Sequence, residues 1–179
     1  MDVNTLKSVY FIGAGGIGMS ALVRYFLYKD KKVGGYDRTP SELTEKLIEE
    51  GAQIYYEEAV ESIPSDFLDA QSTLIVYTAA MPENHVLLQY FRNNGFTVYK
   101  RAQVLGMLTR SCKGLCAAGT HGKTTTSSMM AHLLYQSQVG CDAFLGGISK
   151  NYATNLLLSD NSEYVVIEAD EFDRSFHWL

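Results

Sequence analysis

The sequence predicts an α/β protein with two domains, residues 1–108 and 109–179. Short apolar runs alternate with stretches in which apolar residues recur at helical spacing, which is typical of parallel α/β units. A glycine-rich segment follows an apolar run twice, at residues 13–18 and 119–122. Because each segment lies between a predicted strand and a predicted helix, each indicates a separate strand–loop–helix unit.

In the first half, apolar runs predict strands and helical spacing predicts helices. Ser41 is a typical N-cap, and Gly51 and Gly95 are expected to end helices. In order, we expect a strand at 9–12, a helix through 17–26, a strand at 32–37, a helix from 41 to 51, strands at 53–56 and 72–78, a helix through 86–95, a strand at 96–100 and a helix at 101–110.

The pattern starts again in the second half, with a domain boundary near residues 106–112. We expect a strand at 114–118, a loop at 119–123, a helix at 124–136, a strand at 141–147, a polar stretch at 148–162 and a strand at 164–170. A domain of roughly 70 residues is small. We therefore expect that this chain is part of a longer protein and stops within its second domain.

Composition excludes several classes of partner. With 46% hydrophobic residues, 20% charged residues and a net charge of −5, the chain has no basic cluster that would favour nucleic acid. No run approaches the ~20 apolar residues of a membrane span, so we expect no membrane insertion. The odd count of 3 cysteines predicts reduced thiols and a cytoplasmic location. We favour a position in or beside a buried strand for Cys112 and Cys116. A zinc site formed by these two cysteines and His121 is the alternative.

The first glycine-rich segment fits the pattern G-x-G-x-x-G, with Gly13, Gly15 and Gly18 between a predicted strand and a helix. Such a loop lets a diphosphate approach the backbone at a helix N-terminus. Asp37, at the end of the next strand, is placed to accept hydrogen bonds from a ribose. The residues alone leave NAD, a nucleotide sugar and a turn without ligand as alternatives, with NAD as the first hypothesis.

The second segment is typical of a phosphate-binding P-loop. Gly119, Gly122, Lys123 and Thr124 provide the glycine turn, the lysine for phosphate charge and the hydroxyl for Mg²⁺. Ala117 stands where the longer form of the pattern has a glycine. Acidic residues follow the apolar run "VVI", and Glu168 is the predicted Mg²⁺ ligand among Glu168, Asp170, Glu171 and Asp173.

Three segments together, "GAGGIGMSALVRYF", "AGTHGKTTT" and "EADEFDRSF", resemble the signatures of the Mur ligase family. The family's P-loop has the form A-G-T-x-G-K-T-T, so Ala117 lies outside the motif and the loop is intact. The resemblance implies a Rossmann-like parallel-sheet N-terminal domain that binds a UDP-sugar, followed by the start of a P-loop α/β ATPase domain that binds Mg·ATP.

The resemblance also implies the residues of each site. The UDP-sugar residues would be Gly13, Ala14, Gly15, Gly16, Ile17, Gly18, Met19, Ser20, Asp37, Thr78, Ala79, Ala80 and Arg101. The ATP residues would be Gly119, Thr120, His121, Gly122, Lys123, Thr124 and Thr125. Lys123, Thr124 and Glu168 would be catalytic, with Thr124 and Glu168 as the metal ligands.

The implied reaction belongs to peptidoglycan precursor synthesis: L-alanine is joined to the lactyl carboxylate of UDP-N-acetylmuramate through an acyl phosphate made from ATP. Alternatives are a murein-tripeptide recycling ligase, an NAD-binding Rossmann module and a P-loop ATPase. The chain departs from many relatives at Tyr56 and Glu57, where they have Gly-His, and at Phe172 and Arg174. From these 179 residues alone we expect UDP-sugar binding, weak ATP binding and no turnover.

Overall fold

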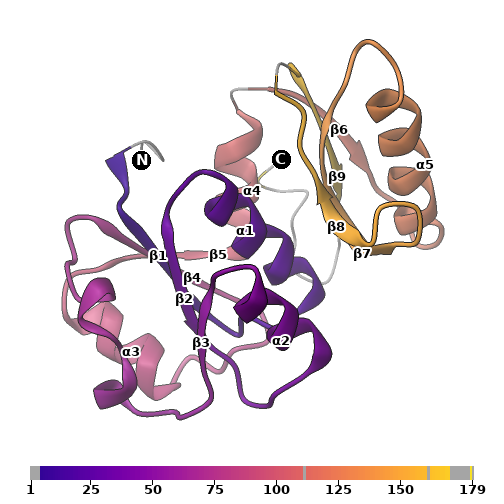
Figure 1. The fold of residues 1–179 in the computed structure, drawn as a ribbon. Helices are drawn as coiled ribbons and strands as arrows, with labels where there is room; N and C mark the ends of the chain where they lie inside the picture. Colours follow the sequence, from indigo (N-terminus) through magenta and orange to yellow (C-terminus); the bar gives the residue numbers. More distant parts are fainter. Residues whose placement is uncertain (1–4, 111, 161, 170–177, 179) are drawn as a thin grey trace. The chain divides into compact units, whose positions relative to one another are not determined.

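The computed structural model describes residues 5–110, 112–160, 162–169 and 178, and Figure 1 shows its helices and strands. The chain divides into two units, residues 1–101 and 102–179. Each unit contains one sheet and one of the two glycine-rich loops. No helix in the described part of the chain is long and apolar enough to cross a membrane.

The first unit is built on a five-stranded sheet in the order β3-β2-β1-β4-β5, and all four pairings are parallel. β1 and β4 are buried along their whole length, as expected for strands covered on both faces. The strands are β1 (Ser8–Ile12), β2 (Lys32–Tyr36), β3 (Gln53–Tyr55), β4 (Thr73–Tyr77) and β5 (Thr97–Lys100). The predicted Rossmann-like sheet is confirmed.

Alternate residues of β1 pack against different helices, because successive side chains of a strand point to opposite faces. Phe11 packs against Phe26 of α1, with ring centroids 6.2 Å apart. Tyr10 packs against Phe91 of α3 at 5.4 Å. The helices of this unit and of the connection to the second are α1 (Ile17–Tyr28), α2 (Glu42–Glu49), α3 (Val86–Asn93) and α4 (Arg101–Thr109), with short 3₁₀ turns η2 (Val60–Ser62) and η3 (Ser65–Phe67).

The predicted N-cap at Ser41 is part of a capping box at the start of α2. The Ser41 hydroxyl accepts a hydrogen bond from the Thr44 amide, and Thr44 Oγ1 accepts one from the Ser41 amide at 2.8 Å. We expect Ser41→Ala to lower the free energy of unfolding by about 1 kcal/mol, the usual effect of removing an N-cap. Denaturant titration measures this loss. Ser41→Asp, which keeps an acceptor, should retain the stability; equal losses in both variants would contradict the role of the cap.

The second unit has a four-stranded sheet in the order β6-β9-β7-β8, with the helix α5 (Lys123–Tyr135) packed on it. Its strands are β6 (Lys113–Ala117), β7 (Asp142–Ser149), β8 (Thr154–Leu157) and β9 (Tyr164–Glu168). β9 pairs with β6 and β7 in parallel, whereas β7 and β8 are antiparallel.

The strand β8 corrects the sequence analysis, which treated residues 148–162 as a polar stretch. Asn155 is fully buried in this strand beside Leu156 and Leu157. The run is only four residues long and begins with polar side chains, so it lacks the apolar pattern by which the other strands were recognised. Its antiparallel pairing also makes this sheet mixed rather than purely parallel.

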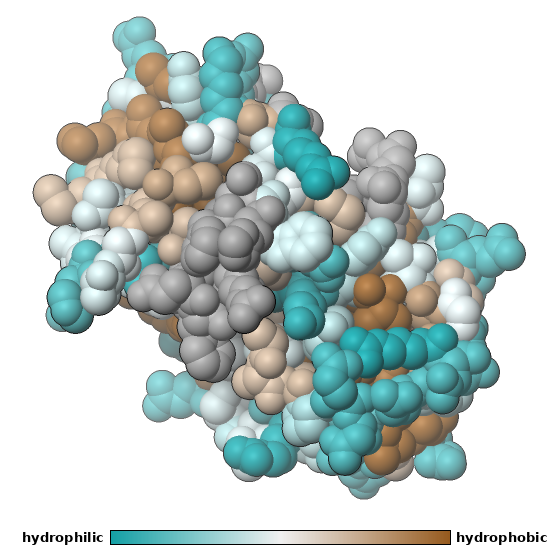
Figure 2. All heavy atoms as spheres, turned by 180° about the vertical axis from the view of Figure 1, so that it is seen from behind, coloured by the Kyte–Doolittle hydropathy of each residue, from teal (hydrophilic) through white to brown (hydrophobic). Residues whose placement is uncertain are grey.

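α5 exposes part of the apolar pattern that predicted it. Met129 and Leu133 have exposed fractions of 62% and 69%, while Met130 and Leu134 are half-buried against the core. Figure 2 shows hydrophobic side chains on the surface of the second unit, where Val139 is also exposed. Helical spacing thus predicted the helix correctly. It did not predict which of its apolar side chains pack against other described residues and which are exposed.

Candidate functional site

A cavity of about 550 Å³ lies at the carboxyl ends of the strands of the first unit. In this sheet the chain leaves β1 toward one side and β4 toward the other, and ligands of open α/β folds bind at such a switch point. The volume is in the range of small-molecule sites. The lining residues are Gly13, Gly15, Gly16, Tyr36, Asp37, Arg38, Thr39, Glu58, Thr78, Ala80, Met81, Pro82 and His85.

Gly13 joins β1 to the loop in a conformation that favours glycine, with φ of +89°. The amide of Thr78 donates a hydrogen bond to Ile12 O at 3.2 Å, which brings the end of β4 beside the loop. A methyl group on Gly13 would lie 2.7 Å from Thr78 Cγ2. Both backbone conformation and space therefore require glycine here, and the predicted residues Gly13 and Thr78 are adjacent.

Asp37, directly after β2, turns its carboxylate toward the glycine loop. The Gly15 amide donates a hydrogen bond to Asp37 Oδ2 at 2.7 Å. Asp37 Oδ1 lies 3.5 Å from the Thr39 amide, at the long limit for a hydrogen bond. The loop thus orients one carboxylate oxygen, and the side chain lines the cavity where a ribose hydroxyl could donate to it.

Arg101 lies against the first turn of α1. A methyl group on Gly18 would be 2.6 Å from Arg101 Nη1 and 3.1 Å from Cζ, so the guanidinium covers this glycine. The N-terminus of a helix carries partial positive charge and amide donors. Arg101 and the start of α1 together form a positive region beside the glycine loop, which suits an anionic group.

Some predicted UDP-sugar residues lie away from the cavity surface. Ala14 and Ser20 are fully buried and Met19 is 2% exposed. The Ser20 hydroxyl donates to Ile17 O at 2.8 Å, within the helix. Ala79 is exposed but does not line the cavity. The buried side chains of Ala14, Met19 and Ser20 support the loop and helix from inside, whereas Gly13, Gly15, Gly16, Asp37, Thr78 and Ala80 line the cavity.

Sequence reasoning missed the wall formed by Tyr36, Glu58 and His85. His85 is the N-cap residue of α3, and its side chain is only 7% exposed. Its Nε2 lies 3.4 Å from Glu58 Oε1, and its ring lies 5.2 Å from that of Tyr36. Burial, followed by the charges of Glu58 and Asp37, raises the pKa of Tyr36 above its ordinary value.

The position of this wall could have been inferred only in part from the sequence. Tyr36 ends a predicted strand, and strand ends of a parallel sheet meet at one edge. Glu58 and His85 lie in connections whose paths no periodic pattern predicts.

Tyr56 and Glu57, which stand where many relatives have Gly-His, both form hydrogen bonds within the first unit. The Tyr56 hydroxyl donates to Thr44 Oγ1 at 3.0 Å, and Glu57 accepts from the Ser62 hydroxyl at 2.9 Å.

The second loop lies where β6 and β9 end together. Ala117 pairs with Glu168 in the parallel register, so the loop leaves the sheet beside this carboxylate. Gly122 is the N-cap residue of α5, with φ of +76° in the left-handed region. α5 then begins at Lys123, and its second residue, Thr124, donates to Glu168 Oε1 at 3.0 Å and Oε2 at 2.9 Å.

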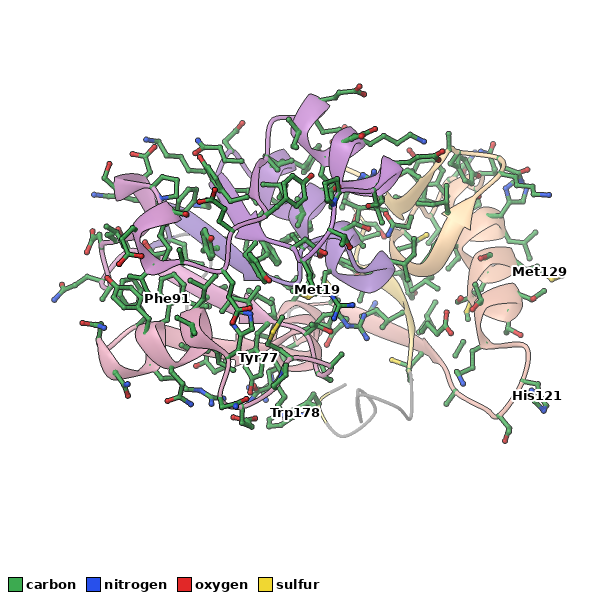
Figure 3. The ribbon with its side chains drawn as sticks, turned by 90° about the horizontal axis from the view of Figure 1, so that it is seen from below. Met19, Tyr77, Phe91, His121, Met129 and Trp178 are labelled. Carbon is green, nitrogen blue, oxygen red and sulfur yellow. The ribbon has the colours of Figure 1, made fainter. Side chains whose placement is uncertain are left out.

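Lys123 folds back over the loop. Its Nζ donates a hydrogen bond to Gly119 O at 2.8 Å, which places the ammonium beside the first residue of the loop. His121 is exposed at the turn that precedes α5, and Figure 3 shows its side chain at the outside of this turn. Thr120 and Thr125 are exposed as well. The loop thus has a cation, a helix N-terminus and hydroxyl groups in one place.

The oxygen atoms of Thr124 and Glu168 suit a magnesium ion. Mg²⁺ prefers hard oxygen ligands and is usually held by one or two protein groups together with substrate phosphates. A hydroxyl and a carboxylate already within 3.0 Å of each other match that requirement. Asp170, Glu171, Phe172, Asp173, Arg174 and His177 lie outside the described residues.

The described residues contain no group of three or more His, Cys, Asp or Glu side chains that could hold a metal ion. The alternative of a zinc site at Cys112, Cys116 and His121 therefore has no support in that part of the chain. Cys116 is exposed in β6, a strand that is itself largely exposed, so the expectation of a cysteine in or beside a buried strand is wrong for this position. Burial raises the pKa of the third thiol, Cys141, to about 11.

Comparison with known proteins gives consistent matches. Residues 8–112 match the Mur ligase family, catalytic domain. The UDP-N-acetylmuramate–L-alanine ligase of Phocaeicola vulgatus is 78% identical over 179 residues, which is 100% of this chain and 39% of that protein. The ligase of the same name from Parabacteroides distasonis is 66% identical over the same shares. The chain therefore spans about two fifths of the length of these curated relatives.

Solved structures show the same fold. The crystal structure of UDP-N-acetylmuramate-alanine ligase from Thermotoga maritima matches with a TM-score of 0.80 and 27% identity, covering 92% of this chain and 37% of that one. A UDP-N-acetylmuramate:L-alanyl-gamma-D-glutamyl-meso-diaminopimelate ligase from Neisseria meningitides matches with a TM-score of 0.83, over 94% of this chain and 54% of that one. At 24% identity, the second likeness shows the fold alone.

Proposed function

The chain belongs to the Mur ligase family, and on that premise we propose that it forms the UDP-sugar-binding part and the beginning of the ATP-binding part of a peptidoglycan ligase. The complete enzyme would join L-alanine to the lactyl carboxylate of UDP-N-acetylmuramate in the cytoplasm, with ATP and Mg²⁺. Residues 1–108 would take the UDP-sugar and residues 109–179 would take Mg·ATP.

The observation that carries this proposal is the contact of Thr124 with Glu168 beside Lys123, in a chain that also has a cavity at its first glycine loop. An NAD-binding module has no use for the P-loop, and a simple P-loop ATPase has no use for the first cavity. A ligase that brings two phosphate-bearing substrates together uses both. The curated relatives named for L-alanine ligation favour this enzyme over the tripeptide-recycling ligase.

Each residue then has a chemical role. Amides of the first loop and Arg101 bind the diphosphate, and Asp37 accepts hydrogen bonds from the ribose. Lys123 and the amides of the second loop bind the phosphates of ATP and stabilise the charge that develops during phosphoryl transfer. Thr124 and Glu168 would hold Mg²⁺, which when bound neutralises phosphate charge.

The proposed reaction has two steps, formation of an acyl phosphate and formation of the amide. An oxygen of the lactyl carboxylate forms a bond to the γ-phosphorus of ATP while the bond to ADP breaks, which gives an acyl phosphate. The amine of L-alanine then attacks the acyl carbon, phosphate leaves, and the amine loses a proton as the amide forms. The role of this chain is to position the two substrates and to stabilise the phosphoryl transfer.

Parallel calorimetric titrations of the chain with UDP-N-acetylmuramate, NADH and Mg·ATP test the proposal. We expect saturable binding of the UDP-sugar, weak binding of Mg·ATP and none of NADH. Binding of NADH without the UDP-sugar would overturn it. Ligase turnover by the 179 residues alone would contradict the expectation that these residues are inactive by themselves.

A further inference from the structure

Gly146 of β7 lies directly beside the carboxylate of Glu168. β7 and β9 pair in parallel with Phe144 opposite Ile167, so the residues after Phe144 run past the end of β9, where Glu168 is the last residue. A methyl group on Gly146 would lie 2.0 Å from Glu168 Oε2 and 2.8 Å from its Cδ. The carboxylate therefore occupies the space that a side chain at position 146 would take.

In this position Glu168 accepts both hydrogen bonds from the Thr124 hydroxyl, at 3.0 and 2.9 Å. Glu168 is only half-buried, so tight packing does not hold its carboxylate. Its placement depends on the hydrogen bonds to Thr124 and on the room beside Gly146. A group that needed this room would force the carboxylate away from Thr124.

The backbone conformation of Gly146 does not by itself require glycine. The described glycines with positive φ are Gly13, Gly51, Gly95, Gly119, Gly122 and Gly140. The next residue, Gly147, has room for a methyl group, which would meet Thr124 Cγ2 at 3.7 Å, an ordinary van der Waals contact.

The pairing of β7 is also irregular at this point. Phe144 pairs with Leu156 and Ser149 with Thr154, and the register shifts between these two pairs. Gly146 and Gly147 lie in that interval. Such bulges are common next to active sites, where they change the direction of a side chain or end a ladder.

We propose that Gly146 is a positioning residue for the ATP site: the missing side chain leaves the space from which the Glu168 carboxylate reaches Thr124. The inference rests on the proposed function for its chemical consequence, because the pair it positions is the one that would hold Mg²⁺. The position of the Glu168 carboxylate beside Gly146 is a property of this chain and does not depend on the proposed function.

The test compares Gly146→Ala with Gly147→Ala. In crystal structures of the two variant chains, we expect the Thr124–Glu168 hydrogen bonds to be lost in the first and kept in the second. Thermal midpoints should be similar, because the atom displaced is the far end of a flexible side chain. The affinity for Mg·ATP should fall about tenfold in Gly146→Ala, the lower end of losses seen when the support of a metal ligand is removed.

Two further readouts separate positioning from general damage. The affinity for ATP measured in EDTA should not change in Gly146→Ala, because only the metal-dependent part of binding is affected. Glu168→Gln should weaken Mg·ATP binding in the native chain but add little in the Gly146→Ala background, since neighbouring residues that act together are not additive.

Retention of both Thr124–Glu168 hydrogen bonds in Gly146→Ala would overturn the inference, whether or not the chain binds nucleotide. Equal Mg·ATP affinities of the two alanine variants would overturn it as well. Failure of the proposed function is a separate outcome: it would appear as NADH binding in place of UDP-sugar binding by the native chain and would leave the crystallographic comparison valid.

Discussion

We expect Lys123→Met to lower the turnover of the complete ligase on the order of 10³-fold, where the largest effects of removing one hydrogen-bond donor meet the smallest effects of removing a cation that stabilises phosphoryl transfer. The ammonium lies within the second glycine loop, with Nζ 2.8 Å from Gly119 O. Methionine has a similar length and no charge, so the loop should fold while the γ-phosphate loses its cation. Steady-state kinetics with saturating UDP-N-acetylmuramate and L-alanine measures the effect.

Lys113→Met is the matched control for loss of a lysine in the same unit. Lys113 is the first residue of β6 and lies outside the loop. It forms an exposed ion pair with Glu163 at 2.7 Å. An exposed ion pair contributes little to stability, so this variant should fold and retain turnover. Similar kinetics for the two variants would show that Lys123 has no role in phosphoryl transfer.

Gly15→Ala should weaken binding of UDP-N-acetylmuramate on the order of 100-fold. A methyl group there would lie 2.6 Å from Thr44 Cγ2 and 3.0 Å from Asp37 Oδ2, so the loop and the carboxylate must move apart. The hydrogen bond from the Gly15 amide to Asp37 is 2.7 Å long, and hydrogen bonds to charged groups contribute about 1.5–3 kcal/mol. Calorimetry with the UDP-sugar measures the loss.

Gly16→Ala is the comparison, because its methyl group would meet Met19 Cγ at 3.7 Å, an ordinary contact. We expect a much smaller loss of affinity than for Gly15→Ala, although both residues line the cavity. Denaturant titration of both variants separates overpacking, which costs about 1–3 kcal/mol, from loss of binding. Equal UDP-sugar affinities would show that the space at Gly15 is not needed for the site.

The elements that position both loops were predictable from local pattern. β1 and β4 are continuous apolar runs because both of their faces are covered, and such runs stand out in a sequence. The helices α1 and α5 follow glycine loops and show apolar residues at helical spacing. By contrast, β8 begins with Thr154 and Asn155, and only its pairing with β7 makes it a strand.

The glycine, lysine and threonine residues of the two loops were recognised from their spacing, and their roles in binding stay a prediction. The wall of Tyr36, Glu58 and His85 could not be recognised in this way, because the fold brings together the end of β2 and two connections that are far apart in sequence. The same is true of Gly146, whose role depends on the parallel register of β7 with β9.

The sequence by itself determined the two glycine-rich loops, the α/β class and the family, because these depend on residues that are close along the chain. Only the tertiary structure decided which predicted residues line the cavity, which are buried as support, and that Glu168 meets Thr124 in the space left by Gly146. Strand register and the paths of connections set these contacts, and both follow from packing between residues far apart in sequence.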